Sequence, residues 1–303
     1  MRSGFACIVG RPNVGKSTLT NAMVGQKVAI TSSKPQTTRR VIRGIVNTGE
    51  GQLVLVDTPG VHRPRTLLGE RLNAMVSDTW SEVDVVVMCI PADEPIGPGD
   101  RFIAQEIASI PKKIKKIAVV TKIDTTAKQE VGEQLLAVGQ LGAELGINWE
   151  HIVPVSAKSH TQVDLLTQLL IEQLPEGMPL YPEGEHTDEP ELITIAELIR
   201  EAALEGVQDE LPHSIAVVID EMNLREDRPA DRPLMDVFAV IFVERESQKH
   251  IVIGKGGSRL KEVGTTARQE ISKLLGIPVH LDIRVKIAKD WQRDPKQLDR
   301  LGF

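Results

Sequence analysis

Short apolar runs rich in β-branched residues alternate with stretches of helical period through the first half of the chain. The runs are hydrophobic along their whole length, which is typical of strands in a sheet covered on both faces. Strands are therefore predicted over 5–10, 41–47, 52–60, 83–90, 116–124 and 151–158. Apolar residues at intervals of three or four predict helices over 16–25, 99–110, 127–146 and 161–174. The alternation predicts an α/β domain with a mostly parallel central sheet flanked by helices, and a ligand site beyond the carboxyl ends of its strands.

A stretch rich in proline and acidic residues separates this half from the rest of the chain. It reads PEGMPLYPEGEHTDEP and spans 175–190, where the prolines prevent a helix and few side chains can be buried. We therefore expect a first domain over 1–175, a linker over 176–190 and a second domain over 191–303. The length of 303 residues agrees with two domains, because single cores stop growing at roughly 250 to 300 residues.

The second domain has its own order of elements. Periodicity predicts a helix over 191–207, strands over 214–222 and 234–244, a short helix ending in IVIGKGG at 251–257, a helix over 258–276 and a strand over 278–288. The order α-β-β-α-α-β predicts a small α+β domain with helices on one face of its sheet.

Formal charge is distributed unevenly along the chain. The net charge is −6, which by itself favours solubility and argues against a nucleic-acid partner. Residues 176–246 carry 5 basic and 19 acidic side chains, whereas residues 247–303 carry 12 basic and 6 acidic ones. The basic C-terminal part therefore indicates an anionic partner.

The two cysteines give no sign of a metal site or a disulfide framework. Cys7 and Cys89 lie inside apolar strand-like runs without a neighbouring His or Cys at metal-ligand spacing, so we interpret both as core residues of a protein in a reducing compartment. No apolar run approaches the roughly 20 residues of a transmembrane helix, and Gly10, Arg11 and Pro12 interrupt the first apolar stretch. We expect a cytoplasmic protein, with a peripheral contact to the inner face of the cell membrane left open.

The most specific motif is GRPNVGKS, from Gly10 to Ser17. It matches the phosphate-binding pattern G-x-x-x-x-G-K-[ST] and lies between a predicted strand and a predicted helix, as that pattern requires. Main-chain N–H groups of residues 13–17 can donate to a polyphosphate, aided by the helix dipole. Lys16 would bridge the β- and γ-phosphates, the Ser17 hydroxyl would ligate Mg²⁺, and Thr18 would contact the α-phosphate. A turn followed by a surface lysine is the less favoured alternative.

Three further segments bear on the identity of the nucleotide. VLVDTPG places Asp57 at a strand end, where it can hold a Mg²⁺-bound water, and the Gly60 N–H can reach a γ-phosphate. In TKID, the Asp124 carboxylate can accept from guanine N1–H and the 2-amino group, both of which adenine lacks. Lys122 would lie over the base, and in SAK the Ala157 N–H would reach guanine O6.

Together, GRPNVGKS, DTPG, TKID and SAK resemble a Ras-like GTPase domain of the translation-factor-related class. With VIGKGG in the C-terminal part, nearly the whole chain resembles the Era family, bacterial GTPases in which a P-loop GTPase domain precedes a smaller α+β KH domain of type II. The expected nucleotide-binding residues are Gly10, Asn13, Val14, Gly15, Lys16, Ser17, Thr18, Asp57, Thr58, Pro59, Gly60, Thr121, Lys122, Asp124, Ser156, Ala157 and Lys158.

The resemblance implies a function as well as a fold. It implies a switch that binds GTP or GDP, hydrolyses GTP, binds single-stranded RNA near the 3′ end of small-subunit ribosomal RNA and assists maturation of the small ribosomal subunit, with no role for DNA. Two alternatives remain: a nucleotide-gated RNA-binding scaffold with negligible turnover and, less favoured because of TKID and SAK, an ATP-driven RNA remodeller.

The chain departs from the family pattern N-K-x-D, because Thr121 stands in place of Asn. The usual carboxamide ties the base-binding segment to the phosphate loop and contacts guanine, whereas threonine offers one shorter hydroxyl. A lost hydrogen bond of this kind costs about 1–3 kcal/mol. We therefore expect weaker nucleotide affinity, with guanine preference retained through Asp124.

Two segments are predicted to respond to the nucleotide. TSSKPQTTRRVIRG, which contains Pro35, suits a mobile switch, and residues 60–73 suit a second switch that leads into a helix. By resemblance, Thr38 ligates Mg²⁺, with Thr37 as the alternative. Val61 stands where many Ras-like enzymes place a water-orienting glutamine, so the resemblance implies slow hydrolysis stimulated by K⁺ that Asn13 coordinates. The expected catalytic residues are Asn13, Lys16, Thr38 and Gly60, and the expected metal ligands are Ser17, Thr38 and, through water, Asp57.

The sequence GKGG, from Gly254 to Gly257, matches the GXXG loop with which KH domains clamp a single-stranded backbone. An isolated G-x-x-G is weak evidence, but the order of elements and the basic C-terminal part favour this interpretation. Aromatic residues make up only 3% of the chain, so recognition by rows of stacked bases is not expected. The expected RNA-binding residues are Ile253, Gly254, Lys255, Gly256, Gly257, Arg259 and Lys261, with Arg268, Arg284 and Lys286 as further candidates.

Overall fold

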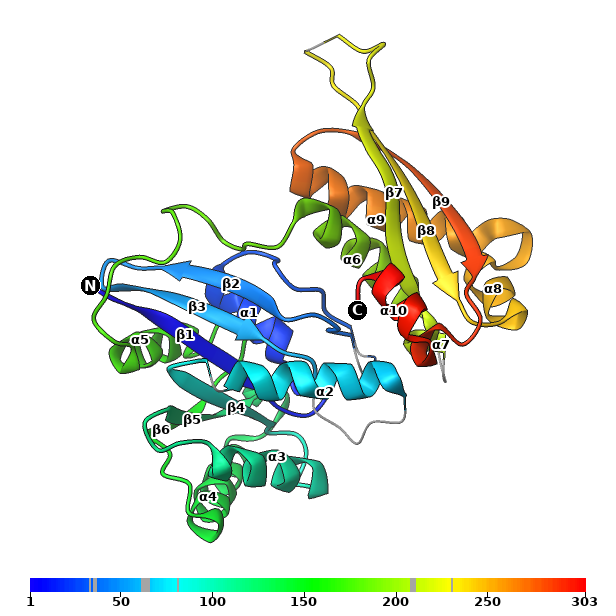
Figure 1. Cartoon of the computed structure of the whole chain (residues 1–303). Helices are drawn as coiled ribbons and strands as arrows, with labels where there is room; N and C mark the ends of the chain where they lie inside the picture. The colour runs from blue at the N-terminus through cyan, green and yellow to red at the C-terminus, as the bar shows by residue number, and fades with distance from the viewer. Residues whose placement is uncertain (33, 35–36, 61–65, 81, 208–210, 230) are drawn as a thin grey trace. The chain divides into compact units, whose positions relative to one another are not determined.

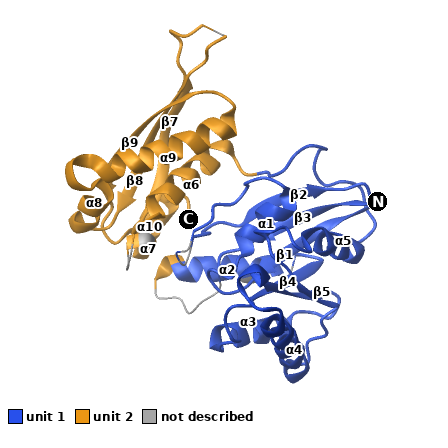
Figure 2. Cartoon of the chain, turned by 180° about the vertical axis from the view of Figure 1, so that it is seen from behind, with its two compact units in different colours: residues 1–65, 69–188 blue, residues 66–68, 189–303 orange. Residues whose placement is uncertain are grey.

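The computed structural model describes residues 1–303 except 33, 35–36, 61–65, 81, 208–210 and 230. The chain divides into two compact units, the first formed by residues 1–65 and 69–188 and the second by residues 66–68 and 189–303 (Figure 2).

A mostly parallel sheet forms the centre of the first unit, as the alternating pattern predicts (Figure 1). Among the described residues its strands follow the order β2-β3-β1-β4-β5-β6, and each neighbouring pair is parallel except β2 with β3. The strands are β1 (Arg2–Val9), β2 (Ile42–Asn47), β3 (Gly51–Asp57), β4 (Val85–Pro91), β5 (Lys115–Thr121) and β6 (His151–Pro154). β3 and β4 are buried at every position, which explains why their sequences are apolar without alternation.

Helices cover both faces of this sheet and create two separate cores. On one face pack α1 (Lys16–Val24) and α5 (Val163–Gln173), through residues such as Leu19 and Leu166. The other face is covered by α2 (Leu67–Trp80), α3 (Pro98–Ser109) and α4 (Lys128–Leu145). The 3₁₀ turn η1 (Ile123–Thr125) follows β5.

The second unit is a small α+β domain, as the order of its elements predicts. Its described strands form a sheet of order β7-β8-β9, in which β7 and β8 are antiparallel and β8 and β9 are parallel. Helices α6 and α9 pack together, α6 against β7 and α9 against β9. The elements are α6 (Glu191–Leu204), α7 (Leu211–Ser214), β7 (Ala216–Leu224), β8 (Met235–Val243), α8 (Glu246–Ile253), η2 (Lys255–Gly257), α9 (Ser258–Leu275), β9 (Val279–Ile287), η3 (Trp291–Arg293) and α10 (Pro295–Leu301).

The end of the chain packs through an aromatic anchor that the periodicity does not reveal. Trp291 in η3 is fully buried, and its indole N–H donates to the Ser214 carbonyl at 3.0 Å. The Phe303 ring stacks on Trp291 with centroids 5.4 Å apart. The last residues are therefore part of the fold of the second unit.

Residues 176–188, which the sequence assigns to a linker, are bonded to the first sheet, from a bridge between Glu176 and Arg2 of β1 to the edge strand β2. Thr187 forms a β-bridge with Gly44 of β2, and the Ile45 N–H donates to the His186 carbonyl at 2.8 Å. Pairing of this kind satisfies the main-chain groups of an edge strand, which would otherwise face solvent.

Buried Gln52 of β3 fastens the same segment from the side. Its Oε1 accepts from the main-chain N–H groups of Leu180 and Tyr181 at 2.7 and 2.9 Å, and its Nε2 donates to the Tyr181 carbonyl at 2.9 Å. One side chain thus replaces the regular ladder that the prolines prevent.

Among the described residues, no helix combines the length and apolar character needed to cross a lipid bilayer.

Replacing Gln52 by leucine should release residues 178–186 from the sheet edge. Gln52→Leu removes the acceptor of two main-chain N–H groups, so we expect the free energy of unfolding to fall by about 1–3 kcal/mol. Amide hydrogen exchange at Leu180 and Tyr181 should accelerate before the rest of the unit exchanges. Gln168→Leu, at an exposed position of α5, is the control; equal exchange in both variants would contradict this role of Gln52.

Candidate nucleotide-binding and RNA-binding sites

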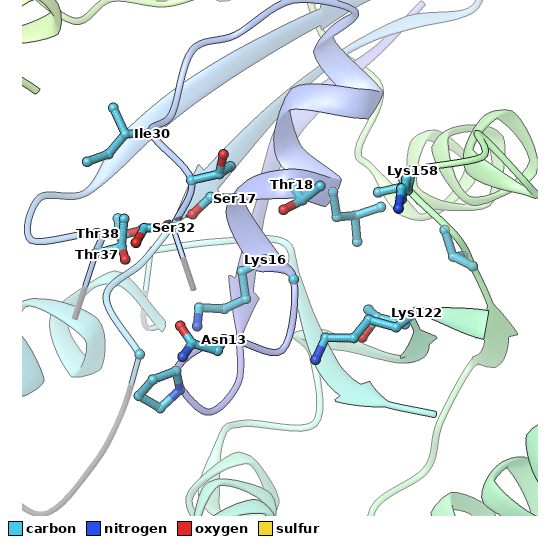
Figure 3. A pocket seen from close by; sticks show the side chains of 18 of the residues that line it. Asn13, Lys16, Ser17, Thr18, Ile30, Ser32, Thr37, Thr38, Lys122 and Lys158 are labelled. Carbon is cyan, nitrogen blue, oxygen red and sulfur yellow. Dashed lines mark hydrogen bonds between the residues drawn. The ribbon is translucent and has the colours of Figure 1, made fainter. Parts of the chain in front are cut away.

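One pocket lies at the carboxyl end of the first sheet, where the sequence predicts the ligand site (Figure 3). Its volume is about 270 Å³. The predicted residues that line it are Asn13, Gly15, Lys16, Ser17, Thr18, Thr38, Gly60, Thr121, Lys122, Asp124, Ala157 and Lys158. The other predicted residues do not line it and are buried: Gly10, Val14, Asp57, Thr58, Pro59 and Ser156. The predicted lining residues come from five separate stretches of sequence, and four of these meet because they follow the parallel strands β1, β3, β5 and β6.

The loop from Gly10 to Ser17 wraps around the lysine that follows it. Asn13 and Gly15 have φ values of 64° and 96°, which makes the turn tight. Lys16 is 6% exposed, and its Nζ donates to the main-chain carbonyls of Gly10 and Arg11 at 3.1 and 2.9 Å. Burial lowers the pKa of Lys16, an effect that the Asp57 carboxylate opposes. The ammonium group is therefore held within the loop and gains from a nearby anion.

Three side-chain oxygens predicted as metal ligands lie together beside this loop. The Ser17 hydroxyl donates to Asp57 Oδ2 at 2.6 Å and lies 2.9 Å from the Thr38 hydroxyl. Asp57 is fully buried, and burial raises its pKa to about 6 although Lys16 opposes the shift. Its Oδ1 has no hydrogen-bond partner among the described residues. A buried carboxylate oxygen without a partner, beside two hydroxyl groups, fits a hard cation such as Mg²⁺.

The same contacts separate the two threonines that the sequence leaves as alternatives. Thr38 is the one whose hydroxyl contacts Ser17, whereas the Thr37 hydroxyl donates to the Lys34 carbonyl at 2.6 Å. Pro35 and Val61, on which parts of the switch and hydrolysis predictions depend, lie outside the described residues.

At the other end of the pocket, the Asp124 carboxylate is held in place by a buried serine. Ser156 is fully buried, and its hydroxyl donates to Asp124 Oδ1 at 2.6 Å while accepting from the Ser159 N–H at 3.1 Å. Lys122 has a φ of 58°, and its Nζ lies 3.5 Å from Asp93. The segments TKID and SAK thus form one wall of the pocket.

Thr121, the departure from the family pattern, ties this wall to the phosphate loop. Its buried hydroxyl donates to the Val14 carbonyl at 2.6 Å. The shorter side chain therefore makes the structural link that we attribute to asparagine in the pattern N-K-x-D. Only the contact of a carboxamide with the base is left without a counterpart at this position.

Several lining residues were not predicted from the sequence, namely Pro12, Leu19, Ile30, Thr31, Ser32, Thr125 and Val155. Ile30 is placed by Asn21 of α1, whose Nδ2 donates to the Ala29 carbonyl at 2.7 Å and whose Oδ1 accepts from the N–H groups of Val28 and Ala29 at 2.9 Å. No local pattern reveals this contact. The position of Thr125 directly after TKID is the one signal that would have identified it.

The glycine-rich loop of the second unit, Gly254 to Gly257, has a backbone conformation that favours glycine. Gly254, Gly256 and Gly257 all have positive φ values of 74°, 60° and 79°. A methyl group at Gly254 would lie 2.7 Å from Cβ of Arg259, so a larger residue does not fit there. Lys255 and Gly256 are exposed, and α9 begins directly after the loop without a side-chain cap at its N-terminus. Such a helix start can receive a phosphate group.

A groove of about 510 Å³ runs beside this loop, between α9 and β9. Leu260, Leu281 and Ile283 give it an apolar floor, and Lys261 and Arg268 add positive charge. A methyl group at Gly264 would make an ordinary van der Waals contact with Ile283, 3.8 Å away, so the space here does not require glycine. The β9 residues of this groove were not predicted, since they belong to an ordinary strand pattern.

Three of the predicted basic side chains direct their charge away from the loop and groove. Arg259 donates through Nη2 to the main-chain carbonyls of Ala203 and Glu205, at and just after the end of α6, so its guanidinium is used within the fold. Arg284 and Lys286 are exposed and alternate along β9 with Ile283, which places them on the opposite face of the sheet. Lys255, Lys261 and Arg268 remain as the basic side chains at the loop and groove.

Comparison with known proteins identifies both domains. The model of a family described as 50S ribosome-binding GTPase matches residues 5–122, and a KH domain model matches residues 210–292. GTPase Era of Streptomyces coelicolor is 66% identical over 302 residues, covering 100% of this chain and 95% of that protein. GTPase Era of Mycolicibacterium smegmatis is also 66% identical, covering 100% of this chain and 99% of that protein.

Solved structures extend the likeness to the whole fold. A crystal structure of Era in complex with MgGDPNP and nucleotides 1506–1542 of 16S ribosomal RNA is 37% identical, has a TM-score of 0.93 and covers 100% of this chain and 99% of that one. A variant of Era from Aquifex aeolicus, bound to GDP.AlF4⁻, is similar at 37% identity and a TM-score of 0.91, with the same coverage. Full-length identity above 60%, the matching fold and both domain models together show that the chain belongs to the Era family of GTPases, which hydrolyse GTP.

Proposed function

We propose that the pocket of the first unit binds GTP or GDP with its phosphates on the loop of residues 10–17 and its guanine beside Asp124. This assignment rests on the difference between the two ends of the pocket. Ser17 and Thr38 lie at one end, and Lys122 and Lys158 lie at the other (Figure 3). The Ser156 hydroxyl holds the Asp124 carboxylate, so its acceptor atoms are oriented before the base arrives. A site that hydrogen-bonds the N1–H and 2-amino group of guanine rejects adenine strongly.

Mg²⁺ fits the cluster of Ser17, Thr38 and Asp57. The two hydroxyl groups would ligate the ion directly and Asp57 would do so through a water, using the Oδ1 atom that has no partner among the described residues. The ion would neutralise charge that develops on the phosphates during hydrolysis. Lys16 would add a fixed positive charge beside it, and the Gly60 N–H would donate to the terminal phosphate.

Members of the family hydrolyse GTP. At the phosphate end of this pocket, however, no described side chain is suited to take a proton from the attacking water. We propose that K⁺ supplies positive charge instead, coordinated by the Asn13 carboxamide. Asn13 is exposed at the pocket with a φ of 64°, and its side chain and that of Lys16 lie close together in Figure 3. A cation at this place would act on the same phosphates as Lys16.

We propose that the second unit binds single-stranded RNA near the 3′ end of small-subunit ribosomal RNA and that the chain assists maturation of the small ribosomal subunit in the cytoplasm. The loop of residues 254–257 would clamp the backbone, and the adjoining groove would take unstacked bases on its apolar floor. A relative of the same fold is seen with nucleotides of 16S ribosomal RNA, which supports this proposal. A peripheral contact with the cell membrane is not part of it.

The link from Thr121 to the phosphate loop should matter for nucleotide binding. Thr121→Val keeps the shape of the side chain and removes the donor to the Val14 carbonyl, so GDP affinity should fall by about 1–2 kcal/mol, roughly 5- to 30-fold. Thr121→Ser keeps the hydroxyl and should bind GDP nearly as the parent chain does. Isothermal titration calorimetry measures both, and equal affinities for the valine and serine variants would remove the proposed link.

Phosphate release at saturating GTP tests the role of Asn13. The parent chain should turn over repeatedly and faster in K⁺ than in Na⁺, at least tenfold if the ion stabilises the transition state by about 1.4 kcal/mol. Asn13→Ala should lose this difference, so that its rates in K⁺ and Na⁺ become equal, because the alanine offers no oxygen ligand to the ion. Asn148→Ala, at an exposed position of the same unit, is the control. Equal rates of the parent chain in the two salts would exclude the K⁺ proposal.

Lys255 should contribute charge to RNA binding without base preference. Lys255→Glu should weaken binding of a single-stranded oligonucleotide from the 3′ end of small-subunit ribosomal RNA and reduce the slope of log K against log salt concentration by about 0.7–1. Lys273→Glu, on α9 but paired with Glu270 at 2.7 Å, is the matched control. The same loss in both variants, measured by fluorescence anisotropy, would mean that only net charge matters.

A further inference from the structure

Arg11 is tied by its side chain to a helix outside the nucleotide pocket. It is not among the residues that line the pocket, although it lies inside the phosphate loop. Its Nε donates to Asp100 Oδ1 at 2.8 Å, and its Nη2 donates to Glu94 Oε2 at 3.1 Å. The Asp100 side chain is 1% exposed and that of Glu94 is 50% exposed, so the Asp100 contact is the buried one.

Asp100 is itself held firmly by the start of α3. Its second oxygen, Oδ2, accepts from the Gly97 N–H at 2.9 Å, which closes the first turn of the helix. Ile103 and Ile107 of the same helix are fully buried in the core under the sheet. The carboxylate therefore extends from a rigid element and can serve as a fixed point for the loop.

The aliphatic part of Arg11 lies directly on this helix. A methyl group at Gly99 would come within 2.7 Å of Arg11 Cδ and 3.2 Å of its Cγ. The missing side chain at Gly99 thus leaves room for the arginine to reach Asp100. A close approach of this kind leaves the Arg11 side chain few other conformations.

The main chain of Arg11 connects this contact to the pocket. Its carbonyl accepts from Lys16 Nζ at 2.9 Å. The next two residues are Pro12, whose ring is rigid, and Asn13, whose φ is 64°. Movement of Arg11 would therefore shift both the acceptor that orients Lys16 and the turn that presents Asn13.

We propose that Asp100 is a positioning residue for the phosphate loop: through Arg11 it holds residues 10–13 in the conformation that presents Lys16 and Asn13 to the nucleotide. The conformational entropy of the loop is then lost during folding, so less is lost when the nucleotide binds. The inference rests on the proposed role of Lys16 at the phosphates. It adds a residue that no pocket contact or local motif identifies.

Asp100→Asn separates this function from the helix cap. The asparagine Oδ1 can still accept from the Gly97 N–H, which turns its amide nitrogen toward the donating guanidinium of Arg11. Two donors then face each other, so the link to the loop is lost while the cap is kept. Arg11→Met breaks the same link from the other side and leaves the cap untouched. Arg101→Ala is the matched control, because it removes an exposed ion pair with Glu144 from the neighbouring position of α3.

The experiment compares GDP affinity and GTP turnover with the unfolding midpoint of the nucleotide-free full chain. Asp100→Asn and Arg11→Met should each weaken GDP binding and reduce kcat/KM roughly 10- to 100-fold, as expected for a displaced phosphate-binding group. Each substitution leaves a buried group without its partner, so each midpoint should fall below that of Arg101→Ala while the chain stays folded at the assay temperature. A purely structural role would lower affinity only through the fraction of the chain that unfolds. The double variant should show no loss beyond that of Arg11→Met alone, because Asp100 acts on the loop only through Arg11, whereas Arg11→Met also removes the contact with Glu94.

Three outcomes would overturn the proposal. Asp100→Asn and Arg11→Met could bind GDP as tightly as Arg101→Ala does, or the losses of the two single variants could multiply in the double variant. The third outcome is a loss of GDP affinity that the unfolded fraction of each variant fully explains. Lys16→Ala tests separately the underlying assumption that the loop of residues 10–17 binds the phosphates. If that variant still binds GDP as the parent chain does, the proposed role of the loop fails. If it loses binding and Asp100→Asn does not, only the positioning role of Asp100 fails.

Discussion

Parallel pairing of β1 with β3 and β4 is the constraint on which the nucleotide site depends. Because β1 lies between these two strands, the loop after Val9 emerges between Asp57, at the end of β3, and the end of β4. β5 and β6 extend the same edge and carry Asp124 and Ser156 to the other end of the pocket. The pairing of the strands therefore brings the main chains of these segments together at one edge of the sheet.

The first unit carries buried charge at the phosphate loop. Lys16 and Asp57 are both buried. Burial lowers the pKa of Lys16 and raises the pKa of Asp57, so in each case it favours the neutral form of the side chain. Burial of charge is costly unless partners compensate for it, and here the compensation comes from main-chain carbonyls, a serine hydroxyl and the opposite charge of the pair. A nucleotide with a cation would complete this arrangement, so the proposed binding would offset part of the cost of burying these groups.

The rest of the chain uses different means for different tasks. In the second unit, a loop of positive-φ glycines brings the main chain to the surface next to a groove with an apolar floor and basic side chains. Residues 176–188 are held against β1, β3 and β2 by main-chain bonds and by Gln52, although their prolines exclude regular structure. The segment before the second unit is thus an ordered part of the first.

Local sequence determined the phosphate loop, TKID, SAK and the glycine loop, because each depends on main-chain conformation or on neighbours within a few residues. The order of strands and helices also determined the two folds and the edge at which the first three motifs meet. Contacts between side chains distant in sequence were decided by tertiary structure alone. The Thr121 hydroxyl donates to the Val14 carbonyl, and the hydroxyl of Thr38, not that of Thr37, contacts Ser17. Arg259 donates to a carbonyl at the end of α6, and Asp100 accepts from Arg11. A hydroxyl or guanidinium finds its partner only when packing sets the separation of two elements to within an ångström or so, and no local pattern encodes that distance.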